Sequence, residues 1–202
     1  MKKVLLIAVA FLLICGGCGV YKTFVNLSRL QFKLSGVSSI SVAGVNVQGK
    51  NKLQDFSAGE VLTLTSAVSK GSLPLSVTLN VEAKNPNDGS GGYPSTNATI
   101  KSFPYRFLVN DKQVVTGNIN SAVTVPGTGQ TSIIQLNIGF DLYQVVQNGS
   151  YNDLLNLALS IGGIGKGNSN VSLYAKPVVS TSIGDISYPQ EIRIVEMQFS
   201  GN

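Results

Sequence analysis

The stretch LPLSVTLNVEAKNPN, residues 73–87, decides the fold of this chain. From Leu75 onward apolar and polar residues alternate, and this period of two is typical of a β-strand with one buried face. The apolar set consists of Leu75, Val77, Leu79, Val81 and Ala83. A slip of one residue would move this whole set into water, so the register is fixed. Asn85-Pro86-Asn87 ends the strand, because proline has no N–H for the ladder and biases the preceding residue away from helix.

Similar alternation on both sides of this stretch predicts a mainly β chain. Upstream, residues 29–34 and 40–47 are interpreted as a pair of strands separated by a break at Gly36. Further strands are expected at 98–101, 104–109, 114–119, 121–125, 132–140, 171–179 and 192–199. Short strands at roughly ten-residue spacing favour an immunoglobulin-type antiparallel β-sandwich. The regular alternation favours sheets with one wet face over a buried parallel sheet.

Two helical regions are expected beside the strands. Ser57 stands three residues before Glu60, which is the spacing of a capping box, and apolar residues at helical spacing follow. A helix is therefore predicted over 57–70, with a glycine just beyond it as its stop. A second helical region is predicted over 141–146 and 150–161, where a broad apolar face follows an Asn-Gly interruption.

The first eighteen residues, MKKVLLIAVAFLLICGGC, have the form of a bacterial lipoprotein signal. Two lysines precede an apolar run from Val4 to Ile14, which is too short for a helix to cross a hydrocarbon core of about 30 Å. Small residues then lead to Cys18, whose thiol would take a diacylglycerol and become the new N-terminus after cleavage. We expect a signal peptide over 1–17, a lipid tether over 18–26 and one domain over 27–202.

An ordinary secretory signal with an incidental cysteine is the alternative, because Cys15 stands at a position usually filled by leucine. Either signal predicts export from the cytoplasm. The residue after Cys18 is Gly19 and not an aspartate, which under the enterobacterial sorting rule indicates the outer membrane. We therefore expect a protein of the bacterial cell envelope, anchored by lipid and facing the periplasm.

Composition excludes several kinds of chemistry. The chain of 202 residues has no histidine, which removes the commonest general base and the commonest zinc ligand. Its only cysteines are Cys15 and Cys18, so the mature domain cannot hold a disulfide framework. Loss of the two signal lysines lowers the net charge by two from +5, and no basic cluster is interleaved with aromatics, so no nucleic-acid partner is expected.

Three motifs that could carry chemistry are weak. Ser66 to Lys70 lies at the end of the predicted helix, where a lysine favours the last carbonyl groups. The run that begins at Asn85 holds one carboxylate, too few for a calcium loop. Residues 162–167 lack the preceding strand and the Gly-Lys-Ser/Thr ending of a phosphate loop. We therefore expect no enzyme activity, no catalytic residues, no cofactor and no metal site.

The strand that ends in Asn85-Pro86-Asn87 resembles the group 2 late-embryogenesis-abundant (LEA_2) proteins and the related Water stress and Hypersensitive response (WHy) domain. FLVNDKQVVTG, residues 107–117, is similar to the strand, short polar turn, strand and glycine of that family. VTVPGTGQTSIIQLNI, residues 123–138, is similar to its proline, small polar residues and apolar strand. The resemblance is good over 73–145 and loose over about 25–180, and the glycine-rich insertion at 88–96 departs from it.

This resemblance implies an immunoglobulin- or fibronectin III-like β-sandwich, no established enzyme chemistry, and an association with dehydration or osmotic stress. It also implies a structural role for Asn85, Pro86 and Asn87, since asparagines can bond nearby backbone where a strand ends. We expect a lipid-anchored envelope protein that protects against desiccation or osmotic stress, with the membrane as its partner through the lipid on Cys18. The alternative is an envelope binding module that holds a partner protein or an apolar ligand between the sandwich and helix 150–161.

Overall fold

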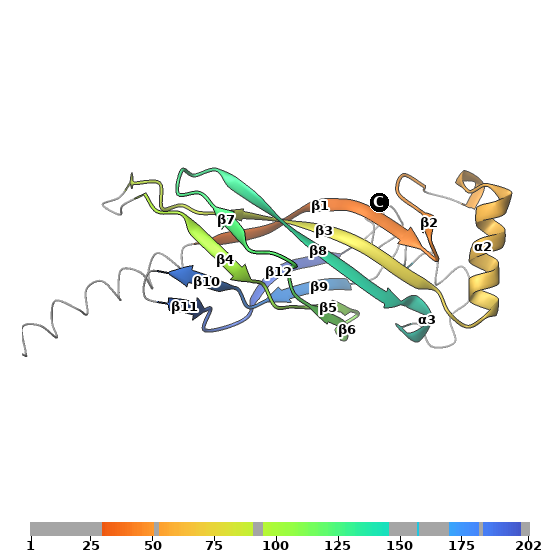
Figure 1. Ribbon diagram of the computed structural model, residues 1–202. Coiled ribbons are helices and arrows are strands. Elements are labelled where there is room, and N and C mark those ends of the chain that lie inside the picture. The colour runs from red at the N-terminus through yellow and green to blue at the C-terminus, as the bar shows by residue number, and fades with distance from the viewer. Residues whose placement is uncertain are drawn as a thin grey trace, which may run out of the picture.

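The computed structural model describes residues 30–50, 53–90, 95–145, 157, 170–181 and 184–198 (Figure 1). The strands are β1 (Gln31–Val42), β2 (Val45–Asn46), β3 (Pro74–Lys84), β4 (Ala98–Ser102), β5 (Tyr105–Val109), β6 (Lys112–Gly117), β7 (Val123–Val125), β8 (Thr131–Asp141), β9 (Asn170–Ala175), β10 (Val178–Thr181), β11 (Gly184–Ser187) and β12 (Ile192–Gln198). The helices are the 3-10 turn η1 (Leu53–Asp55), α2 (Ala58–Ser69) and α3 (Leu142–Val145). The predicted signal peptide, the tether with Cys18 and all of helix 150–161 except Leu157 lie outside the described residues.

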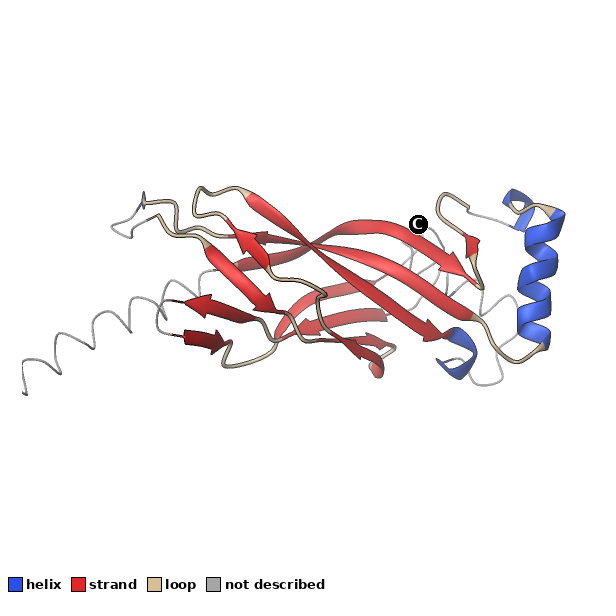
Figure 2. Cartoon of the chain, viewed as in Figure 1, coloured by secondary structure: helices blue, strands red, loops and turns tan. Residues whose placement is uncertain are grey.

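One layer of the fold is a sheet of long strands in the order β2-β1-β3-β8, all antiparallel. The central strand is β3, and its inward residues from Leu75 to Ala83 are each at most 2% exposed. They face the second layer, so the register predicted from their alternation is confirmed. The strands β1, β3 and β8 run unbroken along the length of the molecule (Figure 2).

The second layer consists of two antiparallel sheets, β11-β10-β4-β7 and β12-β9-β5-β6. Each strand of one sheet is consecutive in the chain with one strand of the other: β4 with β5, β6 with β7, β9 with β10, and β11 with β12. The second layer therefore consists of four long strands, each interrupted once. The breaks fall at 103–104, 118–122, 176–177 and 188–191. Hydrogen bonds link neighbouring breaks, among them Lys176 N to Pro104 O at 2.9 Å and Tyr188 N to Pro177 O at 2.9 Å. All four breaks therefore lie at one level of the layer.

Aromatic rings fill the core at the level of these breaks. Phe32 from the first layer packs against Phe103 and Tyr188 of the second, with ring centroids 5.5 and 6.2 Å apart. Phe103 is fully buried, and its N–H donates to Asn118 Oδ1 at 2.6 Å. The side chains at the breaks thus close the sandwich where the second layer has no continuous ladder. The predicted antiparallel β-sandwich with two added helices is confirmed.

The helix α2 begins and ends as its sequence predicts. Ser57 N donates to Glu60 Oε2 at 2.8 Å and Glu60 N donates to Ser57 Oγ at 3.3 Å, which completes the capping box. Beyond the helix Gly71 adopts φ +71°, and its N–H bonds Val68 O at 2.9 Å. The helix buries Leu64 and covers the end of the sandwich at which β3 begins (Figure 1).

The structure differs from the sequence predictions in several details. Residues 29–34 and 40–47 do not pair with each other, because β1 continues through Gly36 as an irregularity in the ladder and pairs with β3. Its hairpin partner is only the short β2. The stretch 171–179 is two strands of different sheets, since Pro177 cannot donate to a ladder. The strand β11 was not predicted, and the helix expected at 141–146 is described only as α3.

Candidate functional surface

Asn85 joins the two layers at the end of β3. Its side chain is 0% exposed. Nδ2 donates to Thr96 O at 2.7 Å and to Val125 O at 3.3 Å, both in segments that belong to the second layer. Oδ1 accepts from Asn87 N at 3.1 Å and from Asn87 Nδ2 at 2.9 Å. The amide of Asn85 is thus bonded to backbone and to Asn87, an arrangement that suits a structural joint.

The chain approaches itself closely beside this joint. A Cβ built on Gly127 would lie 2.4 Å from Thr96 O, which is closer than side-chain carbons come to backbone atoms. Gly127 N donates to Asn97 Oδ1 at 3.0 Å, and Ser95 Oγ donates to Gly127 O. Only a residue without a side chain fits this contact. Nothing in the local sequence predicts this approach.

The outward face of β1, β3 and β8 is uncharged over three rows of cross-strand neighbours. We call it the uncharged face: Ser39, Ser41, Ser76, Thr78, Asn80, Gln135, Asn137 and Gly139. One row forms a chain of hydrogen bonds, from Ser39 Oγ to Thr78 Oγ1 at 3.1 Å and from Thr78 Oγ1 to Asn137 Oδ1 at 2.9 Å. The groups that face water here are therefore hydroxyls and amides, each able to donate and to accept.

A shallow hollow of about 380 Å³ lies over part of this face. Gly139 has no side chain to fill it, and a Cβ there would meet nothing closer than Leu75 O at 3.8 Å. Beside it, Asn80 Oδ1 is shielded from solvent and has no hydrogen-bond partner among the described residues. The face can therefore bind hydroxyl or amide groups, and it has no charge with which to select ions.

Charges border the uncharged face without entering it. Lys33 and Glu82 form an ion pair of 3.0 Å one row beyond Asn80. At the other end, partial burial by itself raises the pKa of Asp141, but hydrogen bonds from Ser72 Oγ and the N–H groups of Leu73 and Tyr143 outweigh it and hold the pKa below its usual range. The carboxylate of Asp141 thus accepts its hydrogen bonds from Ser72, Leu73 and Tyr143 next to it.

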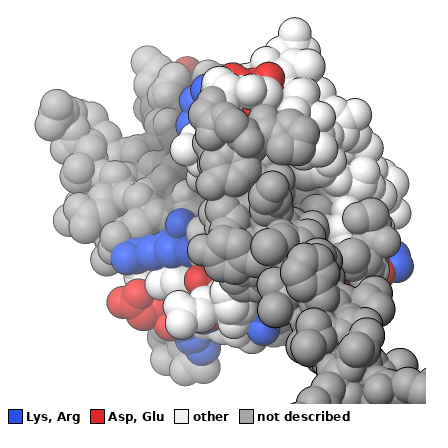
Figure 3. Space-filling view, turned by 90° about the vertical axis from the view of Figure 1, so that its left-hand side faces the viewer, with Lys and Arg blue, Asp and Glu red and all other residues white. Residues whose placement is uncertain are grey.

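The outward face of the second layer carries ion pairs. Arg106 binds Glu191 through Nε and NH2, with its NH2 2.9 Å from Glu191 Oε2, and this hydrogen bonding raises the pKa of Arg106. Its guanidinium also lies 4.2 Å from the ring centroid of Tyr174. Lys101 pairs with Asp185, and this hydrogen bond lowers the pKa of Asp185. Figure 3 shows charged side chains gathered on the lower left of the end view and a mostly white surface on the right.

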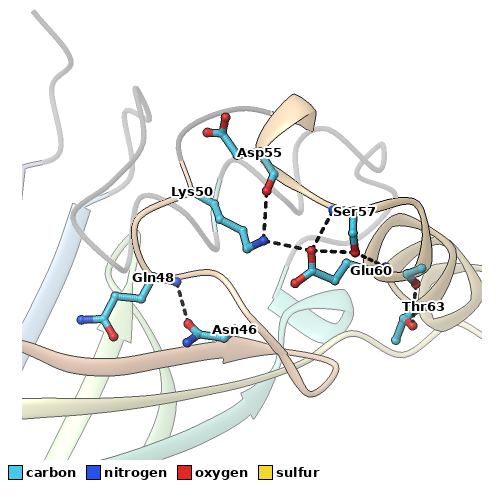
Figure 4. A network of polar contacts seen from close by, with 8 residues as sticks. Asn46, Gln48, Lys50, Asp55, Ser57, Glu60 and Thr63 are labelled. Atoms are coloured by element: carbon cyan, nitrogen blue, oxygen red, sulfur yellow. Dashed lines mark hydrogen bonds and ion pairs between the residues drawn. The ribbon is translucent and has the colours of Figure 1, made fainter.

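A polar network fixes the start of α2 (Figure 4). Lys50 Nζ donates to Asp55 O at 3.0 Å and to Glu60 Oε2 at 2.9 Å, and it lies 4.8 Å from the centroid of the Phe56 ring. The hydrogen bond from Lys50, followed by that from Ser57 N, lowers the pKa of Glu60. This network positions the helix. Farther along α2 lies a hollow of about 520 Å³ next to Leu62, whose side chain is 70% exposed.

The described residues include neither a candidate metal site nor a helix that could span a membrane. Within those ranges no group of three histidine, cysteine, aspartate or glutamate residues could hold a metal ion. No helix that the structure describes is long and apolar enough to cross a membrane.

The fold and surface define a class: a β-sandwich protein with one uncharged outer face and one ion-paired outer face. No family model matches the chain, and no curated protein matches it. A crystal structure of a protein from Archaeoglobus fulgidus is similar at 13% identity over 60% of this chain and 86% of that one, with a TM-score of 0.34. A solution structure of a protein from Arabidopsis thaliana is similar at 10% identity over 65% and 73%, with a TM-score of 0.33. Likenesses this low identify neither a family nor a function.

Proposed function

We propose that the protein is a lipid-anchored, non-enzymatic protein of the bacterial cell envelope, similar to LEA_2 proteins, that protects neighbouring proteins from desiccation or osmotic stress. The lipoprotein signal that ends at Cys18 supports the anchor, and the motif order from Asn85 to residue 138 supports the resemblance. The observation that carries the protective role is the uncharged face of β1, β3 and β8.

The chemistry of the uncharged face suits a surface that loses its water. Hydroxyl and amide groups can exchange hydrogen bonds with water for hydrogen bonds with a neighbouring protein. A charged face would bear a much larger desolvation cost, and its ion pairs would weaken as salt is concentrated by drying. The uncharged face can therefore contact dehydrating proteins without depending on salt.

The lipid anchor would determine which end of the sandwich lies nearer to the membrane. Gln31 pairs with Lys84, so the first described residue, Leu30, lies beside the Asn85 end of the sandwich. A lipid on Cys18 would bring that end close to the bilayer. At about 3.4 Å per residue, the twelve residues of β1 carry the α2 end about 40 Å farther out. The three rows of the uncharged face, which lie five to ten residues along β1 from Gln31, would then be held away from the bilayer surface.

The proposal is tested by drying a labile enzyme with the purified protein. Recovery of activity after rehydration is compared with equal masses of albumin and of an unrelated β-sandwich. Recovery well above both controls is expected if the surface protects. Recovery no better than the controls would overturn the protective role and leave the fold unaffected.

A second candidate function is a binding module for an envelope protein partner or an apolar ligand. The observation that favours it is the hollow of about 520 Å³ beside α2, where exposed Leu62 lies near Ala43 and Pro74. This hollow differs from the groove first expected, because helix 150–161 is outside the described residues except for Leu157. Leu62→Lys would abolish partner capture if this hollow is the site, while Ser69→Lys on the same helix would leave capture unchanged.

A further inference from the structure

The outer edge of β8 has backbone groups that no described strand pairs. In its sheet β8 is the last strand, next to β3 only. Asn137 O accepts from Tyr105 OH of the second layer at 2.8 Å, so the carbonyl of Asn137 points away from β3. Backbone direction alternates along an antiparallel strand, so Ile133, Gln135 and Gly139 point their N–H and C=O groups to the same outer edge.

This edge lacks the features that usually protect a sheet edge. From Thr131 to Phe140 the strand has no charge and no proline. Other edge strands are only two or three residues long, as β2 and β7 are, or carry a charge. The charges on those strands are Lys112 on β6, Asp185 on β11 and Arg193 on β12. Short strands and charges prevent a foreign strand from pairing, so β8 is the edge most open to strand addition.

A groove runs along the same edge. Its volume is about 280 Å³, and it lies between β8 and the link from β6 to β7. Ile119, Val123 and Ile133 supply apolar contacts, and Gln135 and Asn137 supply amides. Ile133 is 48% exposed, one of few large apolar side chains exposed in the described part of the chain. The groove offers no charge, so it suits a segment without charge.

We propose that the edge of β8 binds an extended, uncharged segment of an unfolding client protein by strand addition. This inference rests on the proposed protective function and names its client. Backbone hydrogen bonds to Ile133, Gln135 and Gly139 give affinity for any extended chain, and the groove selects uncharged side chains. Covering such a segment keeps it from pairing with other unfolded chains.

A second copy of the chain fits this edge less well. Two β8 strands paired antiparallel would point the Leu30 ends of the two copies in opposite directions. Copies anchored through that end in one membrane surface would have to lie flat on it to take this arrangement. A client strand has no such constraint and can pair in either direction.

The test uses the intact protein and a fluorescent peptide of alternating threonine and valine. The same peptide with an N-methyl group on every residue has no N–H on either edge, so it cannot pair with β8 and should bind about tenfold more weakly or worse. Equal binding of the two peptides, or no binding of the unmodified one, would overturn the proposal. This comparison requires no variant of the protein.

Variants then locate the binding site. Gln135→Pro removes an outward N–H without touching the ladder to β3, and Ile133→Lys places a charge in the groove. Each should weaken peptide binding about tenfold or more, whereas the matched control Gln135→Thr should bind as the parent does. Thermal unfolding identifies any variant that fails to fold. A folded Ile133→Lys or Gln135→Pro that binds like the parent would contradict the site.

The drying assay separates this inference from the function it rests on. If the protein protects a dried enzyme but does not bind the peptide, strand addition is wrong and the protective role stands. If it binds the peptide through β8 but fails to protect, the edge site stands as a peptide site and the protective role is wrong.

Discussion

The two layers of the sandwich differ in both continuity and charge. The layer of β1, β3 and β8 is unbroken, and its outer face bears hydroxyls and amides over three rows. The other layer is broken at one level into two sheets, and its outer face bears the pairs Arg106–Glu191 and Lys101–Asp185. The two outer faces therefore differ in the contacts that they offer: hydroxyls and amides on one, and paired charges on the other.

The largest expected effect comes from breaking the joint between the layers. Asn85→Ala leaves the carbonyls of Thr96 and Val125 without their buried donor, so the free energy of unfolding should fall by about 3 kcal/mol. The control is Asn80→Thr, because Asn80 Oδ1 has no partner to lose among the described residues. Its effect should stay within about 0.5 kcal/mol. Urea denaturation measures the free energy of unfolding of both variants. Equal losses of stability would contradict the role of Asn85 as the joint between the layers.

A smaller loss is expected where Gly127 approaches the backbone of Thr96 closely beside the joint. Gly127→Ala would force a Cβ against the backbone of Thr96, and such overpacking costs about 1–3 kcal/mol. Gly139→Ala on the uncharged face meets only Leu75 O at 3.8 Å and should be neutral or stabilising, since glycine weakens a strand. The two midpoints of thermal unfolding measure this difference. A Gly139→Ala variant less stable than Gly127→Ala would contradict the packing.

Alkaline pH tests two tyrosines of the second layer. Burial raises the pKa of Tyr105 and of Tyr188 above the usual value of 10.0. Above about pH 10 the unfolded chain loses these protons before the folded one does, so stability is full below that pH and falls as pH rises through the folded-state pKa values. Replacing both with phenylalanine should flatten the decline in the free energy of unfolding. An unchanged slope between pH 9 and 12 would contradict this cause.

The smallest effect is expected from the surface ion pairs of the second layer. Arg106→Gln should destabilise only slightly, because exposed pairs contribute little, and the loss should shrink further in high salt. Thr78→Ala on the uncharged face should lose stability by an amount that salt does not change. Unfolding in low and high sodium chloride compares the two. A salt-dependent loss for Thr78→Ala would remove the contrast between the faces.

What the sequence predicted well depends on local pattern. The register of Leu75 to Ala83 follows from alternation within one strand, and the cap of α2 follows from Ser57 and Glu60, three residues apart. Gly36 was misread as a break, since a glycine in a strand can end it or form an irregularity that the partner strand accommodates.

The features that the sequence could not predict depend on contacts between residues that are distant in the chain. Asn85 bonds Thr96 and Val125, 11 and 40 residues away, and nothing in the local pattern names these partners. The uncharged face likewise requires the strand order, because its rows combine Ser39, Thr78 and Asn137 from three separate strands. The open edge of β8 follows only from its position at the end of the sheet.

The most direct measurement compares protection by two double variants of equal net charge. Ser41→Lys with Ser76→Glu places charges on the uncharged face, and Arg106→Gln with Glu191→Gln removes a pair from the other layer. Recovery of a dried enzyme should drop toward that of the albumin control with the first variant and stay at the parent level with the second. Equal recovery with both, or a loss confined to the second, would contradict a protective role of the uncharged face.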